Sequence, residues 1–491
     1  MINVPEEVKM IGEKLKQAGS QAYLVGGCVR DILINKKPAD WDVATNAPPE
    51  KIQENFPDSV YENEFGTVAV KTESDDPTIH IIEVTTFRKE GRYSDKRRPD
   101  SVAFTDSLEE DLSRRDFTVN AIAFNLDESI TKNQESRIVD PFGGQNDLKE
   151  KILRTVGDAE ERFEEDALRL MRAVRLRAQL EFQIEEKTRQ AIKKNAKHLK
   201  RIAKERIRDE LIRLLMTANA ASAIQEMQEL GLLEYVIPEL VEGVGVGQNK
   251  HHIFTVFEHN VRALDYAARN NFSLAVRLAA LLHDVGKPKT KRGVGENSTF
   301  YGHQVVGARM TEKILERLHF SKKIIEKAVL LIREHMFVYD PEAVTLKGVR
   351  RLLRRAGREN MDELFRLREA DRIGSGVPKA QPYRLRHLKA MVEKVQNDPI
   401  SPKMLKIDGN TIMEIIKTGP GPRIGWILSI LLEEVLDDPK LNQNKILEEK
   451  TKKLHNLSDK ELKSLFKRAK ESAGEAQERI DKEIKDKYFV K

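Results

Sequence analysis

The sequence predicts an α+β, multidomain protein in which a small sheet-containing head precedes a longer helical part. The β-rich runs at residues 22–27, 67–72, 79–87 and 101–104 all lie near the N-terminus. From Leu108 onward the apolar residues recur mostly with the 3.6-residue period that is typical of helices. Strands that come before helices, rather than alternating with them, indicate an α+β arrangement.

Two joints divide the helical part. A glycine-rich stretch at residues 243–252 and a proline-containing stretch at Val377–Pro382 interrupt the helical pattern. We therefore expect a head at 1–150, a helical neck and body for base and RNA recognition at 151–242, a histidine-bearing helical domain at 243–376 and a helical basic tail at 377–491.

Composition excludes several classes of protein. The chain has 491 residues, 40% of them hydrophobic, and a single cysteine, Cys28, so neither global disorder nor a disulfide framework is expected. No run approaches the roughly 18 apolar residues of a membrane span, and the first residues lack the apolar core of a signal peptide. We expect a soluble cytoplasmic protein with no membrane partner; the sequence does not predict the oligomeric state.

Basic residues are concentrated in three stretches, although the net charge is only +6. Residues 88–98 hold six Lys and Arg, residues 187–213 hold eleven, and the tail after Pro439 is strongly basic. Such clusters suit a polyanionic partner. For any single cluster, a solvated helix face is the more common explanation.

The strongest chemical signal is LVGGCVRDILINKKPADWDVATNA at residues 24–47. Gly26 and Gly27 end a strand and open a helix, where the absence of side chains allows a triphosphate to approach backbone N–H groups. Arg30 follows one turn later and can bind phosphate oxygens bidentately. A glycine pair after a strand is weak on its own, because most such pairs only form a tight turn.

Asp40 and Asp42 sharpen this signal. Alternate residues of a strand face the same side, so both carboxylates are expected to converge on one point and hold Mg²⁺ for phosphoryl chemistry. An isolated Asp-x-Asp is usually solvent-exposed, and only its position behind the glycine motif favours a metal site. Glu83 joins the site if its strand runs antiparallel beside that of Asp42; a solvated strand residue is the alternative.

Five motifs in order resemble the class II template-independent nucleotidyltransferases, the family of tRNA CCA-adding enzymes and bacterial poly(A) polymerases in the DNA polymerase β superfamily. They are residues 24–47, RRDFTVNA at 114–121, DPFGGQNDL at 140–148, EEDALRLMRAVR at 164–175 and KERIRDEL at 204–211. The resemblance implies a small β-polymerase-like nucleotidyltransferase head followed by an all-helical neck and body.

The resemblance also implies roles for individual residues. The catalytic carboxylates would be Asp40, Asp42 and Glu83. The nucleotide would be bound by Gly26, Gly27, Arg30, Arg115, Asp116, Asn120, Asp166, Arg169, Arg172 and Arg175. Among these, Asp166 and Arg169 would pair with the incoming base, and Arg172 and Arg175 would contact nucleotide or primer.

The template segment has a physical logic of its own. Asp166, Arg169, Arg172 and Arg175 recur every three residues and would lie near one face of a helix. A carboxylate beside a guanidinium offers an acceptor and donors, which suits cytosine and adenine because both present an exocyclic amine beside a ring acceptor. On spacing alone a salt-bridged helix is the better explanation, and only the position after the other motifs favours base recognition.

TTFRKEGRYSDKRRPDSVAF, residues 85–104, resembles the flexible basic loop of enzymes that add all of CCA or only A. This makes a CC-only enzyme the poorer interpretation. It does not separate CCA addition from A addition.

A second constellation consists of histidines and aspartates. His259 lies on a predicted helix, and His283-Asp284 end another, where GKP stops it. The phrase resembles an HD-domain phosphohydrolase, which implies that His259, His283, Asp284 and Asp371 bind a divalent metal of unidentified kind. His303 and His335 are candidates for a second metal or a substrate phosphate. The alternative is a helical body that keeps the HD scaffold without activity.

Together these features predict template-independent addition of CCA to the 3′ end of tRNA from CTP and ATP, with Mg²⁺ at the head. The nearest alternative is A addition alone or poly(A) synthesis. An alternative of another class is an HD phosphohydrolase whose head only binds RNA.

Overall fold

The computed structural model describes residues 3–63, 65–91, 101–127, 135–249 and 253–469. The chain divides into two compact units. The first comprises Met1–Val244, Ala268–Leu274 and Ile314–Phe320, and the second Gly245–Ala267, Ala275–Lys313 and Ser321–Lys491. Strands are confined to residues before 185 and helices follow, so the predicted α+β class is confirmed. The boundaries of the four predicted domains remain predictions.

The head is a mixed sheet with short helices. Its helices are α1 (Glu6–Gln17), α2 (Gly27–Leu33), α3 (Pro49–Asn55), α4 (Leu108–Ser113) and α5 (Gly144–Glu150), with a 3-10 turn η1 (Thr118–Asn120). Its strands are β1 (Tyr23–Val25), β2 (Asp42–Thr45), β3 (Ser59–Asn63), β4 (Thr67–Lys71), β5 (Ile81–Thr86), β6 (Arg88–Glu90), β7 (Val102–Phe104), β8 (Ala123–Asn125) and β9 (Ile138–Val139).

Seven of these strands form one sheet in the order β3-β4-β5-β2-β1-β8-β9. Every neighbouring pair is antiparallel except β2 and β5, which are parallel with Asp42 opposite Glu83. The condition stated for Glu83, a strand antiparallel to that of Asp42, is therefore wrong. The carboxylate still lies opposite Asp42, because partners in a register share a face whichever way the strands run.

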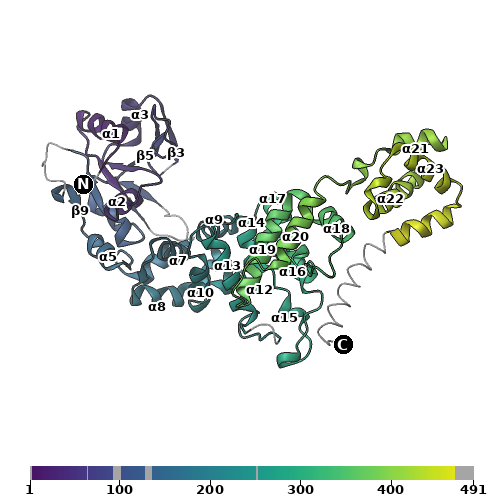
Figure 1. Ribbon diagram of the computed structural model, residues 1–491. Coiled ribbons are helices and arrows are strands. Elements are labelled where there is room, and N and C mark those ends of the chain that lie inside the picture. The colour runs from purple at the N-terminus through teal and green to yellow at the C-terminus, as the bar shows by residue number, and fades with distance from the viewer. Residues whose placement is uncertain (1–2, 64, 92–100, 128–134, 250–252, 470–491) are drawn as a thin grey trace. The chain divides into compact units, whose positions relative to one another are not determined.

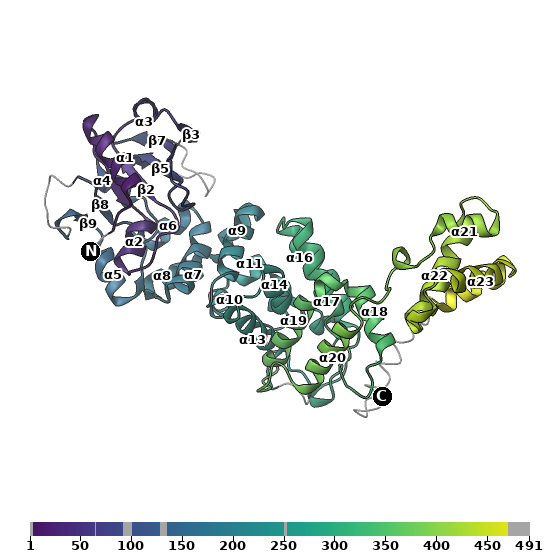
Figure 2. The ribbon, with the colours of Figure 1, turned by 45° about the horizontal axis from the view of Figure 1, so that its top comes forward.

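The two faces of the sheet are covered differently. On one face Val43 and Val84 are fully buried, and α3 packs against the outer strands while α1 packs against α3 (Figures 1 and 2). The other face carries Asp42 and Glu83. Its buried core is formed by Val25, Ala44, Phe87, Leu112, Ala121, Ala123 and Val156. The acidic side chains thus stand on a rigid, packed support.

The rest of the first unit is helical and holds one short parallel strand pair. Its elements are β10 (Ile152–Leu153), α6 (Ala159–Glu165), α7 (Leu168–Leu180), β11 (Gln183–Ile184), α8 (Glu186–Asn195), α9 (Lys204–Leu215), α10 (Ala220–Glu229), α11 (Leu233–Val236) and α12 (Pro238–Val241). α7 is almost wholly buried and packs against α9 and α10. α7 is therefore the central helix of the neck.

The second unit is all helical in its described residues. Its helices are α13 (Val256–Arg269), α14 (Leu274–Leu282), α15 (Lys287–Thr290), α16 (His303–Arg317), α17 (Lys322–Glu334), α18 (Leu346–Ala356), α19 (Met361–Gly374), α20 (Tyr383–Lys394), α21 (Gly409–Ile416), α22 (Pro422–Asp437) and α23 (Asn444–His455). Three of them, α13, α14 and α16, have residues in both units. α21, α22 and α23 pack together, and α22 also packs against α18.

None of the described helices combines the length and apolar character that a membrane crossing requires.

Candidate functional site

The head site starts from three carboxylates, two on one face of the sheet and one just before β2. Asp42 is the first residue of β2, Glu83 lies beside it on β5, and Asp40 sits in a bend just before β2. The prediction that Asp40 lies on the same strand as Asp42 is therefore wrong. Among the described residues, every group of three potential metal-ligand atoms that lie within 4.8 Å of one another belongs to the histidine cluster. The head carboxylates are more widely spaced.

The electrostatics show that these carboxylates nevertheless act on one another. Burial, Asp40 and Glu83 together raise the pKa of Asp42 to about 7, against the lowering effect of Arg115. Burial also raises the pKa of Glu83, with Glu62 and Asp40 adding to the shift. A divalent cation would relieve this accumulation of negative charge, and carboxylate oxygens are the ligands that Mg²⁺ prefers.

The glycine motif leaves room for a guanidinium and a ligand. Gly26 has φ +78°, a backbone conformation that favours glycine, and precedes α2. A Cβ there would lie 2.9 Å from Arg115 Nη1 and 3.4 Å from Asp42 Oδ2. Any side chain at this position would therefore displace Arg115 from its place beside the carboxylate.

A chain of hydrogen bonds joins the glycine helix to the neck. Arg30 Nη1 donates to Asn120 Oδ1 (2.7 Å), Asn120 Nδ2 donates to Asp116 Oδ1 (3.1 Å), and Arg172 Nε donates to Asp116 Oδ2 (2.7 Å). Although burial raises it, Arg172, Asn120 and Arg169 hold the pKa of Asp116 at about 2. Four of the predicted nucleotide-binding residues, from α2, the segment before η1, η1 itself and α7, are thus held in one largely buried network.

The template segment differs from its expected geometry. Asp166 does not lie on a helix with Arg169: it has an extended backbone between α6 and α7, and its Oδ1 accepts from Leu168 N (2.9 Å). It therefore caps α7 instead of continuing a face of it. Its carboxylate accepts from Arg206 (2.8 and 3.4 Å), while Arg169 pairs with Glu165 (2.6 Å).

The later arginines of α7 are engaged by α9. Arg175 Nε donates to Glu210 Oε2 (2.6 Å), and Arg172 Nη1 lies 4.0 Å from Glu210 Oε1. Glu210 is 4% exposed, and Arg175 is 9% exposed. α9 thus binds both ends of the predicted template, through Arg206 at Asp166 and through Glu210 at Arg175.

The second site brings the predicted HD ligands together in a buried cluster. His259 Nε2 and His283 Nε2 lie 2.8 Å apart, and Asp284 Oδ2 lies 3.2 and 3.4 Å from them respectively. Asp371 Oδ1 lies 3.3 Å from the first nitrogen and 3.6 Å from the second. These residues come from α13, the end of α14 and α19, and their ligand atoms converge as divalent coordination requires.

A second group shares one aspartate with the first. Asp284, His303 and His335 also bring three ligand atoms within 4.8 Å of one another. His303 Nε2 and Asp284 Oδ1 lie 3.3 Å apart, and both are buried without a hydrogen-bond partner among the described residues. Such orphaned polar atoms are expected where an ion is to be bound.

Two histidines of the cluster are in the charge state that metal binding requires, whereas, although burial lowers it, the pKa of His259 is raised to about 8 by Asp284 and Asp371. Burial lowers the pKa of His303 to about 4 and that of His335 to about 3, so both rings are neutral at pH 7 and offer a lone pair. Although burial raises it, Lys287 and His283 hold the pKa of Asp284 well below its usual range. Lys287 Nζ lies 2.6 Å from Asp284 Oδ2.

The residues that hold the predicted site residues in place were not predicted from the sequence. Arg206 and Glu210 were within a quoted motif, but their partners lie 40 and 35 residues away. Lys287 follows the HD pair, and Arg368 pairs with Asp371 (2.6 Å) one turn earlier on α19. The three-residue spacing of Asp284 and Lys287 and of Arg368 and Asp371 was a local signal that could have revealed these pairs. Residues 92–100 of the predicted basic loop lie outside the described residues.

Three protein families match successive parts of the chain. The Poly A polymerase head domain matches residues 22–154, a family described as the probable RNA and SrmB-binding site of polymerase A matches residues 181–243, and the HD domain matches residues 256–375.

The chain is similar to known tRNA-processing enzymes. It is 46% identical over 223 residues to a CCA-adding enzyme of Lactobacillus delbrueckii subsp. bulgaricus; the match covers 45% of this chain and 53% of the relative. The chain thus spans only about half the length of the relatives of this kind that it matches. It is 35% identical over 426 residues to an A-adding tRNA nucleotidyltransferase of Deinococcus radiodurans, with 84% of this chain and 91% of the relative covered.

The same similarity extends to a solved structure. The crystal structure of the Bacillus stearothermophilus CCA-adding enzyme in complex with CTP matches with a TM-score of 0.68 and 30% identity. The match covers 91% of this chain and 97% of that one.

Proposed function

This chain belongs to the tRNA nucleotidyltransferase family, which includes CCA-adding and A-adding enzymes, and we propose that it adds CCA to the 3′ end of tRNA from CTP and ATP, releasing pyrophosphate. The observation that carries the proposal is the carboxylate set on β2 and β5 beside the Arg30–Asn120–Asp116–Arg172 network. Arginine side chains that can bind phosphate are thus combined with carboxylates that can bind a metal, as nucleotidyl transfer requires.

We assign Mg²⁺ to Asp40, Asp42 and Glu83. The assignment is supported by the negative charge gathered around Asp42, whose pKa is raised to about 7 by burial and by Asp40 and Glu83. When bound there, Mg²⁺ supplies the positive charge that favours an ionised primer hydroxyl and a departing pyrophosphate.

The chain's own residues position the nucleotide. Gly26 leaves its backbone open to the triphosphate, and Arg115, held beside Asp42, offers donors to the phosphate oxygens. Arg30 and Asn120 are fixed by their mutual hydrogen bond, so they need little reorganisation when nucleotide binds. Catalysis by these residues rests on positioning and electrostatics.

Asp166 and Arg169 select the base. The carboxylate of Asp166 accepts from an exocyclic amine, and Arg169 donates to the adjacent ring acceptor, a pattern that cytosine and adenine share. Arg206 is a positioning residue, because its bidentate pairing fixes the carboxylate of Asp166. Arg172 and Arg175 remain candidates for contacts to nucleotide or primer.

The direct test is the product of the reaction. Purified protein is incubated with Mg²⁺, CTP and ATP and with three RNAs: tRNA lacking its 3′ end, tRNA ending in C and tRNA ending in CC. The proposal predicts that all three products end in CCA and stop there. Both activities have relatives that match most of this chain: the Deinococcus A-adding enzyme, with 84% of the chain covered, and the Bacillus stearothermophilus CCA-adding structure, with 91%. Extension of only the CC-ended tRNA by one A would overturn CCA addition in favour of A addition, and long A tails would overturn it in favour of poly(A) synthesis.

We also propose a phosphohydrolase activity at the HD site. It is supported by the two ligand groups that share Asp284 and by the orphaned His303 Nε2. The substrate class is a phosphate ester at an RNA end. The test is metal-dependent release of phosphate from an RNA 3′-phosphate, with loss in His283→Ala and retention in Asp42→Asn. The cytoplasmic location remains a prediction.

A further inference from the structure

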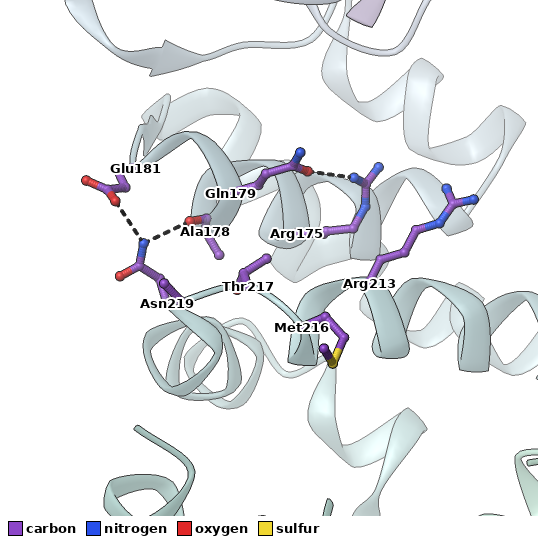
Figure 3. Close-up of a pocket in the computed structure, with 9 residues that line it drawn as sticks. Arg175, Ala178, Gln179, Glu181, Arg213, Met216, Thr217 and Asn219 are labelled. Carbon is purple, nitrogen blue, oxygen red and sulfur yellow. Dashed lines mark hydrogen bonds between the residues drawn. The ribbon is translucent and has the colours of Figure 1, made fainter. Parts of the chain in front are cut away.

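A hollow of about 560 Å³ opens on the neck where the ends of α7 and α9 meet the turn into α10 (Figure 3). This volume is typical of sites that take a small ligand or part of a larger one. Arg175 of α7 and Arg213 of α9 extend beside it, and Met216 lies next to Arg213 (Figure 3). Ala218 also lines the hollow. None of the functions described above uses Arg213, Met216 or Ala218.

The two guanidiniums have donors that the protein leaves unused. The Arg213 side chain is 65% exposed, and its only polar partner in the described part of the chain is Glu210, whose Oε1 lies 3.7 Å away. Arg175 uses Nε for Glu210 and Nη1 for Gln179, which leaves Nη2 without a partner among the described residues. An acceptor placed between them would receive hydrogen bonds from both arginines.

The charge around the hollow is unbalanced. Glu210 is shared by three guanidiniums, those of Arg172, Arg175 and Arg213. Burial lowers the pKa of Arg175, and the neighbouring Arg172 and Arg213 lower it further against the attraction of Glu210. On the opposite wall the Glu181 carboxylate accepts from Asn219 Nδ2 (3.3 Å). An anion between the arginines would therefore relieve like-charge repulsion.

We propose that this hollow binds one phosphodiester of the RNA substrate between Arg175 and Arg213, with the attached ribose against Met216. The proposal rests on the proposed function, which makes RNA the substrate. The probable RNA-binding family match at residues 181–243 includes Arg213, Met216 and Ala218. Arg175 follows Arg172 of the nucleotide network by three residues on α7, a rise of about 5 Å, so the hollow adjoins that network.

The first test removes one guanidinium. Arg213→Gln is compared with Arg201→Gln, a control that removes the same charge from an exposed neck position outside the hollow. Affinity for a tRNA ending in CC is measured by fluorescence anisotropy over a range of salt. We expect Arg213→Gln to weaken binding about tenfold and to reduce the slope of log K against log salt by about 0.7 to 0.9. Arg201→Gln should stay within about twofold of the parent.

The second test places an opposing charge in the hollow without touching either arginine. Ala218 is exposed and lines the hollow. Ala218→Glu should weaken tRNA binding about as much as Arg213→Gln, because a carboxylate competes for the guanidiniums. Ala218→Gln, of nearly the same size, adds bulk without charge and should weaken tRNA binding less than Ala218→Glu does.

Direct binding keeps the proposal independent of the activity. If the protein adds no CCA but the tRNA affinities change as expected, the hollow binds RNA and only the proposed function is wrong. Equal losses in Arg213→Gln and Arg201→Gln would overturn the proposal in favour of diffuse electrostatic attraction. A raised KM for CTP or ATP in Arg213→Gln with unchanged tRNA affinity would overturn it in favour of a site for free nucleotide.

Discussion

Asp116 is the residue on which the hydrogen bonds of the head and neck converge. Its Oδ1 accepts from Asn120 and from Phe117 N, and its Oδ2 accepts from Arg172. The pKa of its carboxyl is held at about 2 against an ordinary value of 3.8. Because the folded state binds this proton more weakly than the unfolded state, ionised Asp116 stabilises the fold.

This stabilisation has a defined pH window. It is fully present above the ordinary pKa and is lost as pH falls through the folded value of about 2. We expect the difference in unfolding free energy between the parent and Asp116→Asn to shrink by about 2 kcal/mol between pH 5 and pH 2. Urea denaturation across this range measures it. A difference that does not change with pH would contradict the assigned network.

Arg206 gives a prediction about base choice. Arg206→Ala frees the carboxylate of Asp166, so we expect the KM for CTP and ATP to rise about tenfold and UTP to be accepted more often. Arg206→Lys should recover only part of the effect, because it cannot pair bidentately. Arg208→Ala, on the same helix but bonded to Asp209 and the His319 carbonyl, is the control. Unchanged base selection in Arg206→Ala would exclude the positioning role.

At the scale of single residues, the sequence predicted which site residues cluster but not which partners fix their side chains. His259, His283, Asp284 and Asp371 could be grouped because their motifs are recognisable, and the structure brings them together. Pairs such as Asp166–Arg206 join different helices, and nothing in the local pattern of either residue specifies the other. Asp166 also caps α7, although the three-residue spacing had suggested a place on the helix itself.

At the scale of elements, strand existence was predictable and strand direction was not. The run at residues 79–87 contains β5, as its β-branched residues indicated. Whether β5 runs parallel or antiparallel to β2 depends on the path of the chain through β3 and β4, which is a long-range property. Although the predicted direction of this strand is wrong, Glu83 still lies opposite Asp42, because that position depends on register alone.

The contact of α5 with η1 provides a prediction at this scale. A Cβ on Gly144 would lie 2.3 Å from the Thr118 carbonyl oxygen and 2.8 Å from Ile122 Cγ1. Gly144→Ala must therefore push α5 away from the turn that carries Asn120. We expect it to lower the unfolding free energy by about 1–3 kcal/mol and to raise the KM for ATP.

The control for this change is Asn146→Ala, at an exposed position of the same helix. It should change stability by no more than about 0.5 kcal/mol. Chemical denaturation and initial-rate kinetics measure both variants. Equal stability of Gly144→Ala and Asn146→Ala would show that the packing of α5 on η1 is looser than the structure indicates.

The whole molecule consists of two compact units, and each carries one of the two candidate sites. The carboxylates and the nucleotide network belong to the first unit. The histidine cluster belongs to the second, since His259, His283, Asp284, His303, His335 and Asp371 all fall within its ranges. The two chemistries are therefore expected to be separable by mutation.

Thermal unfolding tests this separation without any activity assay. Metal bound to the folded histidine cluster stabilises the unit that contains it, by about 2.7 kcal/mol at a hundred times its Kd. We expect Mn²⁺ or Ni²⁺ to raise the midpoint of one unfolding transition in the parent and in Asp42→Asn. The same shift should be absent in His283→Ala. A shift that persists in His283→Ala would place the bound metal elsewhere.

The central claim is that the head carboxylates carry nucleotide addition. Its most direct test is single-turnover addition to a tRNA lacking CCA, measured for the parent, Asp42→Asn and His283→Ala at saturating CTP, ATP and Mg²⁺. The account predicts that Asp42→Asn loses a thousandfold or more of the rate, on the order expected for removing a key electrostatic group. His283→Ala should retain the full rate. Normal addition by Asp42→Asn together with loss in His283→Ala would contradict the account.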